Sequence, residues 1–522
     1  TQSRSSAASD VYKRQDIHYK GGCLLNENLG WAGTMLSYSS RPPDPAIVGE
    51  NWRDMWLERL NNQPNLAEVW LSHQRRDAYW QHGSVCEDYS AIKAKVLAIG
   101  GWGDAYKNAV PQLVENLPDA KGIIGPWVHK YPHFAVPGPR IGFLQEALRW
   151  WDRWLKGIET GVEDDPDLRL YQMDSVRPKS WYLHRDGRWL GCNSDALAHN
   201  TEFHLSRGRK LTTAPEDIVV PLTSPQDVGA EGGEYCAIWL GPELPGDQRR
   251  DDALSICFDS EVLGEALGII GAPQLRLRLS SSQNHGQIAV RLCEVFPDGA
   301  STRLSYAVLN LTHRTNAAAP VSVDLDTPFE VTINLDHMAC TLAKGNRLRV
   351  AISSAYWPLI WPGPGAQEHN ILGGLISFSH IDTRATSTVS MPTPEAASPW
   401  KHRVARESAH ERRRSTDLAT GIVTLDIVDD FGASEDADHG LIAGSIARES
   451  WSIHPEDPLS AKGSTDWTQT MERGGWSIRT EARQHMWSDA EWFYQTAEVE
   501  AFEGDSRIFH REFSAKIKRD HL

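Results

Sequence analysis

Two short apolar runs, each leading to a chemically reactive side chain, place the strongest constraint on how this chain can fold. Residues 96–99 read Val-Leu-Ala-Ile and continue through Gly-Gly-Trp-Gly to Asp104. Residues 122–125 read Gly-Ile-Ile-Gly and continue through Pro-Trp-Val to His129. Apolar runs of this length predict buried parallel strands. Between them, apolar residues recur at three- and four-residue steps from Tyr106 to Leu117, which predicts a helix.

This strand–helix–strand order predicts where the two side chains lie. In doubly wound α/β sheets, functional groups collect at the carboxyl ends of the strands, and a right-handed crossover makes consecutive parallel strands neighbours. We therefore expect Asp104 and His129 to lie close together. A further amphipathic helix is predicted over residues 143–155, which are rich in tryptophan.

An acid on one strand end and a histidine on a later one form the second half of the order Ser, Asp, His that α/β-hydrolases use. The motif GGWxD at 100–104, the motif GPWxH at 125–129 and the Trp-rich helix after them resemble the cocaine esterase and Xaa-Pro dipeptidyl-peptidase family of serine hydrolases. The resemblance extends over residues 16–395. It implies that Asp104 and His129 belong to a catalytic triad.

One expected motif is absent. The resemblance implies a nucleophilic serine in an upstream Gly-x-Ser-x-Gly turn, and no such pentapeptide occurs in the 522 residues. The chain begins with Thr1, and residues 1–15 are unlike the family. We therefore expect a fragment that lacks the N-terminal half of the sheet, together with the serine and the oxyanion donors. A cysteine nucleophile is an alternative, with Cys23 as its candidate, although buried structural cysteines are far more common.

Each candidate residue also has a structural interpretation. Asp104 could simply be the N-cap of the helix that follows it. The rival base to His129 is His133, and the Trp-x-His match favours His129. Aromatic side chains suit apolar acyl groups, so Trp31, Trp102 and Trp127 are predicted to contact substrate. The alternative is that these tryptophans attach cap helices to the sheet.

The predicted fold class is α/β plus all-β. A non-family leader at 1–15 is expected to be disordered, and a partial α/β-hydrolase domain spans 16–165. The resemblance implies a helical cap at about 30–92, and helices are predicted at 49–62 and 66–80. Alternating residues such as those at 275–279 predict a β-sandwich over 166–400, and the resemblance implies a jelly roll there. We interpret 401–415 as a basic linker and 416–522 as a further β-rich region.

Composition narrows the partners. A net charge of −16 argues against nucleic acid, and no apolar run is long enough for a membrane helix. Seven scattered cysteines predict reduced thiols and a cytoplasmic protein. Asp436, Asp438 and Gly440 resemble the start of a calcium loop, but Ala447 stands where a bidentate glutamate is required. We expect no metal and no cofactor.

Two functional hypotheses follow. The first is a serine hydrolase that cleaves an ester or amide in a small-molecule or peptide substrate, which could be an Xaa-Pro peptide, an aryl ester or a β-lactam-type amide. As given, this chain is expected to be inactive because the nucleophile is missing. The second is a non-catalytic β-sandwich protein that binds carbohydrate or a protein partner. A homodimer is compatible with either.

Overall fold

A computed structural model describes residues 11–12, 17–193, 199–239, 241–380 and 386–522. The leader predicted at 1–15 therefore falls almost entirely outside the described residues. Three strands form the parallel part of the structure: β3 (Leu97–Gly101), β4 (Lys121–Gly125) and β5 (Leu168–Met173). Among the described residues β3 pairs only with β4, so it forms the edge of this sheet. The two predicted strands are confirmed.

The segment between β3 and β4 is helical, as predicted. It begins with the 3-10 helix η4 (Ala105–Asn108) and continues as α7 (Ala109–Asn116). The helix α7 packs on β3 and β4 through Val110 and Leu113, which are buried. The interval between the two motifs is therefore a βαβ unit, which positions their ends side by side.

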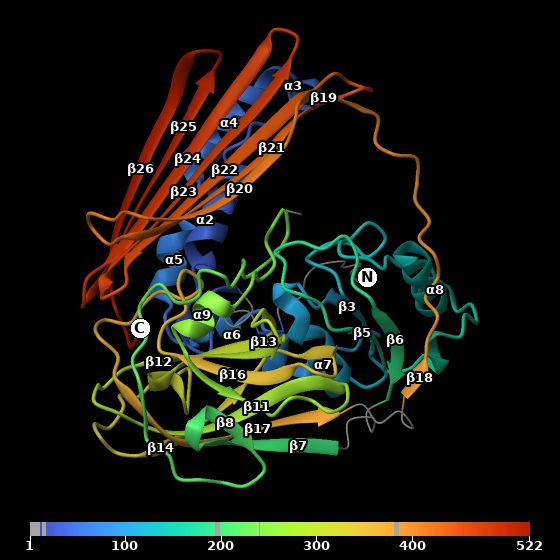
Figure 1. The fold of residues 1–522 in the computed structure, drawn as a ribbon. Coiled ribbons are helices and arrows are strands. Elements are labelled where there is room, and N and C mark those ends of the chain that lie inside the picture. The colour runs from blue at the N-terminus through green and yellow to red at the C-terminus, as the bar shows by residue number, and fades with distance from the viewer. Residues whose placement is uncertain (1–10, 13–16, 194–198, 240, 381–385) are drawn as a thin grey trace.

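The predicted amphipathic helix is α8 (Phe143–Lys156). Its apolar side is not fully covered, because Leu148 is 58% exposed and Trp151 is 40% exposed. The helix is held from its other side, where Glu146 forms ion pairs with Arg149 and Arg169. Figure 1 shows α8 at the margin of the fold, beside β6 (Gly187–Cys192).

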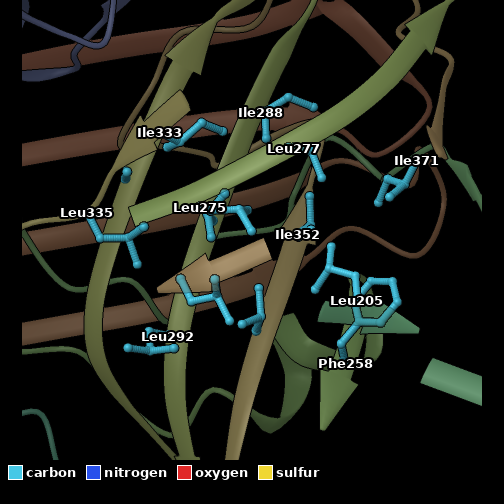
Figure 2. Close-up of a cluster of buried hydrophobic side chains, with 14 of the residues drawn as sticks. Leu205, Phe258, Leu275, Leu277, Ile288, Leu292, Ile333, Leu335, Ile352 and Ile371 are labelled. Carbon is cyan, nitrogen blue, oxygen red and sulfur yellow. The ribbon is translucent and has the colours of Figure 1, made fainter. Parts of the chain in front are cut away.

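The sheet continues from β5 into an antiparallel β-sandwich. Leu275, Leu277 and Leu279 are buried in its core, while Arg278 between them is exposed, which confirms the predicted alternation. Figure 2 shows Leu275 and Leu277 within this cluster. The remaining strands of this part are β7 (His199–Ser206), β8 (Lys210–Thr212), β9 (Val220–Leu222), β10 (Ile256–Asp259), β11 (Leu267–Ser281), β12 (Gln287–Val295), β13 (Ser301–Asn310), β14 (Phe329–Asn334), β15 (Met338–Leu342), β16 (Arg347–Ser353), β17 (His369–His380) and β18 (Thr386–Thr388).

The chain after β18 does not follow the prediction at 401–415. Residues 389–401 are the extended connection, and the predicted basic linker instead forms strands β19 (His402–Arg406) and β20 (Ala409–Thr416). Both pair with β21 (Val423–Asp436), whose acidic side chains face the arginines: Arg403 pairs with Glu435, and Arg406 with Asp430. The charge run is therefore a pair of charged edge strands.

The predicted β-rich region at 416–522 is one long antiparallel sheet. The sheet order is β19-β21-β22-β23-β24-β25-β26, with β20 beside β21. Figure 1 shows it curving over helices from the N-terminal part of the chain. The further strands are β22 (Ile442–His454), β23 (Asp457–Arg473), β24 (Trp476–Ser488), β25 (Trp492–Glu503) and β26 (Ser506–Lys518).

Helices are present within the range 30–92, and three of them, α2 (Glu27–Ser39), α4 (Trp52–Asn62) and α5 (Leu66–Ser72), contact this C-terminal sheet. The helix α2 contacts β23 and β24, and a Cβ atom on Gly33 would lie 2.4 Å from the Thr465 hydroxyl oxygen. The helix predicted at 66–80 is interrupted, because the Asp77 side chain caps a new helix by accepting from the Tyr79 N–H group. The helices are α2 (Glu27–Ser39), α3 (Pro45–Val48), α4 (Trp52–Asn62), α5 (Leu66–Ser72), α6 (Ala78–Gln81) and, in the sandwich, α9 (Arg249–Ala253).

The last residues of the chain join the C-terminal sheet to the sandwich. The Arg519 side chain donates to the carbonyl oxygens of Pro362 (2.6 Å) and Leu522 (2.9 Å). Trp361 donates from its indole to the Ser488 hydroxyl at 2.9 Å. These buried contacts hold the end of the C-terminal sheet against the sandwich. No described helix is both long and apolar enough to cross a membrane.

Candidate active site

Asp104 and His129 meet at the carboxyl ends of β3 and β4. His129 Nδ1 lies 2.9 Å from Asp104 Oδ2, which confirms the expected proximity. The Asp104 side chain is 10% exposed and the His129 side chain 35% exposed. A carboxylate held this close orients the imidazole and favours the tautomer that carries its proton on Nδ1.

The glycine-rich motifs allow the two loops to approach this closely. The backbone N–H of Gly103 donates to the Trp127 carbonyl at 2.9 Å, and Trp102 N–H donates to the Gly125 carbonyl at 2.8 Å. A Cβ atom on Gly101 would lie 2.1 Å from the Trp127 carbonyl oxygen. Any larger residue at 101 would therefore push the two loops apart.

Both interpretations of Asp104 hold at once, because its two oxygens have different partners. Oδ1 accepts from the Tyr106 N–H group at 2.9 Å and caps η4, while Oδ2 faces the imidazole. The N-cap fixes the rotamer of the carboxylate that His129 uses. The structural role thus supports the candidate chemical one.

The surroundings of His129 fit a general base. The hydrogen bond that His129 donates to the Asp104 carboxylate raises the pKa of His129 above its usual range, and burial opposes this effect. Nε2 has no protein hydrogen bond among the described residues. His133 lies among aromatic side chains, and burial lowers its pKa. Its Nδ1 has no hydrogen-bond partner among the described residues. The contact with Asp104 therefore distinguishes His129 from His133.

The three predicted substrate-contacting tryptophans separate into two groups. Trp127 is only 1% exposed and donates to the Pro139 carbonyl at 2.8 Å, and Trp102 donates to the Tyr171 carbonyl at 2.7 Å. Neither is among the described residues that line the cavity, whereas Trp31 is. We interpret the first two as anchors of the motif loops.

A cavity of about 440 Å³ opens on His129. Most of its walls come from helix α2, from the sandwich loop at residues 230–239 and 242–246, and from the C-terminal sheet. Most of these residues could not be predicted from the sequence, since they belong to segments far apart in the chain. Those that matter below are Glu27, Trp31, Cys236, Trp239, Glu449 and Trp467.

The cavity is acidic near α2. Burial, together with the nearby Glu449 and Glu243, raises the pKa of Glu27 from its usual 4.5 to about 8. Burial likewise raises the pKa of Glu449. Glu234 is paired with Arg412, so its charge is balanced within the protein. Glu27 forms no hydrogen bond or ion pair with another described residue. Its negative charge is therefore not neutralised by a cation, and the nearby Glu449 and Glu243 disfavour it.

The cysteines are reduced, as predicted, but the candidate nucleophile Cys23 does not lie at the site. All seven are free thiols. Cys23 is fully buried in the core and does not line the cavity. Cys236, which the sequence did not single out, lines the cavity next to Asp104 and His129. Only the tertiary contacts of the 228–246 loop could have revealed it.

Comparison with known protein families assigns most of the chain. The model of the X-Pro dipeptidyl-peptidase (S15 family) matches residues 2–131. The model of the X-Pro dipeptidyl-peptidase C-terminal non-catalytic domain matches residues 160–413. The sheet from β21 onward lies beyond both matched ranges.

Individual relatives are distant but extensive. Cocaine esterase of Rhodococcus sp. (strain MB1 Bresler) is 26% identical over 426 residues, which cover 73% of this chain and 72% of that protein. A solved aminopeptidase from the marine sediment archaeon Thaumarchaeota archaeon superposes with a TM-score of 0.55 at 17% identity, covering 72% of this chain and 71% of that one. A CocE/NonD family hydrolase from Staphylococcus aureus gives 0.50 at 12% identity, covering 71% and 66%. The two structures show a shared fold.

Proposed function

Because this chain belongs to the X-Pro dipeptidyl-peptidase and cocaine esterase family of hydrolases, we propose that Asp104 and His129 are the acid and base of a Ser–Asp–His triad. The triad cleaves an ester or amide through an acyl-enzyme. The observation that carries the proposal is the 2.9 Å contact between His129 Nδ1 and Asp104, while Nε2 has no hydrogen bond to any residue that the structure describes. In this arrangement Nε2 takes the proton of the nucleophile and returns it to the leaving group, while Asp104 stabilises the imidazolium.

The serine hydroxyl comes from outside residues 1–522. No Gly-x-Ser-x-Gly turn occurs in the sequence, and in α/β-hydrolases that turn exposes the nucleophile at the top of the sheet. The outer edge of β3 has no partner strand among the described residues, which fits a further parallel strand beside it. By itself this chain has negligible hydrolytic activity.

The cavity favours a substrate with an aromatic or apolar part and a positive charge. Trp31, Trp239 and Trp467 supply flat apolar surface, and Glu27 and Glu449 lie on the same lining. An ammonium group would stabilise the ionised form of Glu27, whose pKa is now raised by burial and then by neighbouring carboxylates. Of the three substrate classes, a peptide with a free N-terminus fits this lining best, since its amine is protonated at neutral pH.

The test uses a longer form of the protein that contains an upstream Gly-x-Ser-x-Gly turn. A fluorophosphonate probe should label it, and His129→Ala should abolish labelling while the matched control His133→Ala retains it. Equal labelling of the His129→Ala and wild-type proteins would refute the role of His129. The present chain should not hydrolyse p-nitrophenyl acetate faster than its own His129→Ala variant.

The alternative, a non-catalytic binding protein, makes the opposite prediction. A longer protein without the serine turn, and with no reaction toward the probe, would favour it. Binding of the probe at a residue other than a serine near His129 would also contradict the triad.

A further inference from the structure

Three chemically different side chains converge where the two motif loops meet the sandwich. Asp104 follows β3, His129 follows β4, and Cys236 lies in the loop between β9 and α9. One ligand-capable atom from each lies within 4.8 Å of the other two. The backbone N–H of His129 donates to the Ala237 carbonyl at 2.9 Å, and this bond holds the loop that carries Cys236 against the histidine.

These side chains form a set of zinc ligands. Thiolate, imidazole and carboxylate all bind Zn²⁺, and bond lengths of about 2.0–2.3 Å place neighbouring donors of a tetrahedral site about 3.5 Å apart. The sulfur therefore needs to approach the other two donors by no more than about 1.3 Å, while the Asp104 and His129 atoms, now 2.9 Å apart, separate slightly. Three protein ligands with an open fourth position are the pattern of zinc sites that retain a bound water.

The local charge also favours a dication. Burial raises the pKa of the Cys236 thiol, and Asp104, Glu27 and Glu243 raise it further. The same negative surroundings that disfavour a free thiolate stabilise a bound cation, which then keeps the sulfur deprotonated. The positive charge of the Lys130 ammonium group acts against the binding of a dication. A neutral, buried thiol is a poor nucleophile, so these surroundings argue against Cys236 as a replacement for the serine.

We propose that Asp104, His129 and Cys236 form a zinc-binding site. Zn²⁺ displaces the thiol proton and binds His129 Nδ1, whose proton moves to Nε2 through solvent, with water as the fourth ligand. Binding itself depends only on the three ligands. Its consequence, that zinc withdraws the imidazole from proton transfer and inhibits the enzyme, rests on the function proposed above.

The test measures metal binding directly, on this chain, without any hydrolysis. The protein is freed of metal with a chelator, and Zn²⁺ affinity is measured by calorimetry and by competition with a chromogenic chelator. Co²⁺ is then added as a spectroscopic probe, because a thiolate ligand gives a charge-transfer band and a tetrahedral site gives intense visible bands.

The variants separate this site from the other trio of potential ligands. Glu498, His510 and Glu512 also lie within 4.8 Å of one another, on the exposed surface of β25 and β26. We expect Cys236→Ser and His129→Ala to weaken Zn²⁺ binding by at least about tenfold, because each removes one of three ligands. His510→Ala is the matched control and should leave this affinity unchanged.

A third measurement on the unmodified protein covers the case in which a variant fails to fold. Zn²⁺ should slow alkylation of Cys236 by iodoacetamide, mapped by mass spectrometry, and leave alkylation of Cys86 unchanged. Unaltered zinc affinity in both ligand variants, or a Co²⁺ complex without a thiolate band, would overturn the proposal. Fluorophosphonate labelling of the longer protein, compared with its His129→Ala variant, tests the triad separately. The two proposals can therefore fail independently.

Discussion

Replacing Glu27 by glutamine should stabilise the protein at alkaline pH. Glu27 begins α2 and lies in the cavity with no cationic partner recorded among the described residues. Burial first, and then Glu449 and Glu243, raise its pKa from 4.5 to about 8. Ionising Glu27 is therefore harder in the folded protein than in the unfolded chain.

The pH window follows from this direction. Between pH 4.5 and about 8 the folded protein retains a proton that the unfolded chain has lost, so stability falls as pH rises through this range. Each pKa unit is worth about 1.4 kcal/mol, so the penalty reaches at most ~5 kcal/mol above pH 8. Glu27 is only partly buried, and solvent screening reduces the effect, so we expect a gain of about 2 kcal/mol or more for Glu27→Gln.

Urea unfolding at pH 5 and pH 8.5, followed by tryptophan fluorescence, measures this difference. At the lower pH the variant and the wild type should be nearly equal, since Glu27 is then protonated in the folded state. Glu58→Gln, a change at an exposed position of α4, is the matched control and should show no pH-dependent gain. An equal free energy of unfolding for Glu27→Gln and wild type at pH 8.5 would refute the argument that Glu27 is an unbalanced acid.

Three further predictions follow from the site. Asp104→Asn should lower the pKa of His129, because it removes the carboxylate that raises it; NMR titration of the ring measures this, and an unchanged value would contradict it. The hydrogen bond between His129 and Asp104 contributes its full stabilisation below the usual histidine pKa, and that contribution is lost as pH rises through the raised value. Asp104→Asn should therefore lower the free energy of unfolding most at about pH 6. Gly101→Ala should cost more than ~2 kcal/mol, because its Cβ would meet the Trp127 carbonyl at 2.1 Å; chemical unfolding that detects no loss would show that the loops can separate freely. Benzylamine should quench tryptophan fluorescence more strongly than benzyl alcohol, and Glu449→Gln should narrow this difference; equal quenching by both ligands would argue against an acidic cavity.

The candidate dyad was predictable because its determinants are local. The motif at 100–104 and the motif at 125–129 each follow a short buried strand, and the intervening helix has one apolar face. A parallel βαβ unit then leaves little freedom in how the strand ends meet, so Asp104 and His129 could be expected together before any coordinates were known. The strand alternation around Leu275 was legible for the same reason, because it depends on residues two positions apart.

Contacts between distant segments could not be predicted in this way. The arginines at 403–414 have the composition of a linker, and they form strands because acidic residues of β21 lie opposite them. The resemblance predicts a helical cap near residue 30, but neither the resemblance nor the helical pattern tells which apolar surface a helix will cover, and α2 packs on the C-terminal sheet.

The amino-acid sequence therefore settled the family-like strand ends and the pairing of an acid with a base, since neighbouring residues specify both. The folded chain alone decided the walls of the cavity, the raised pKa of Glu27 and the position of Cys236 beside His129. The burial of a side chain and the electrostatic potential at it depend on all the segments around it, and those segments can lie hundreds of residues apart in the chain. No local pattern records those contributions.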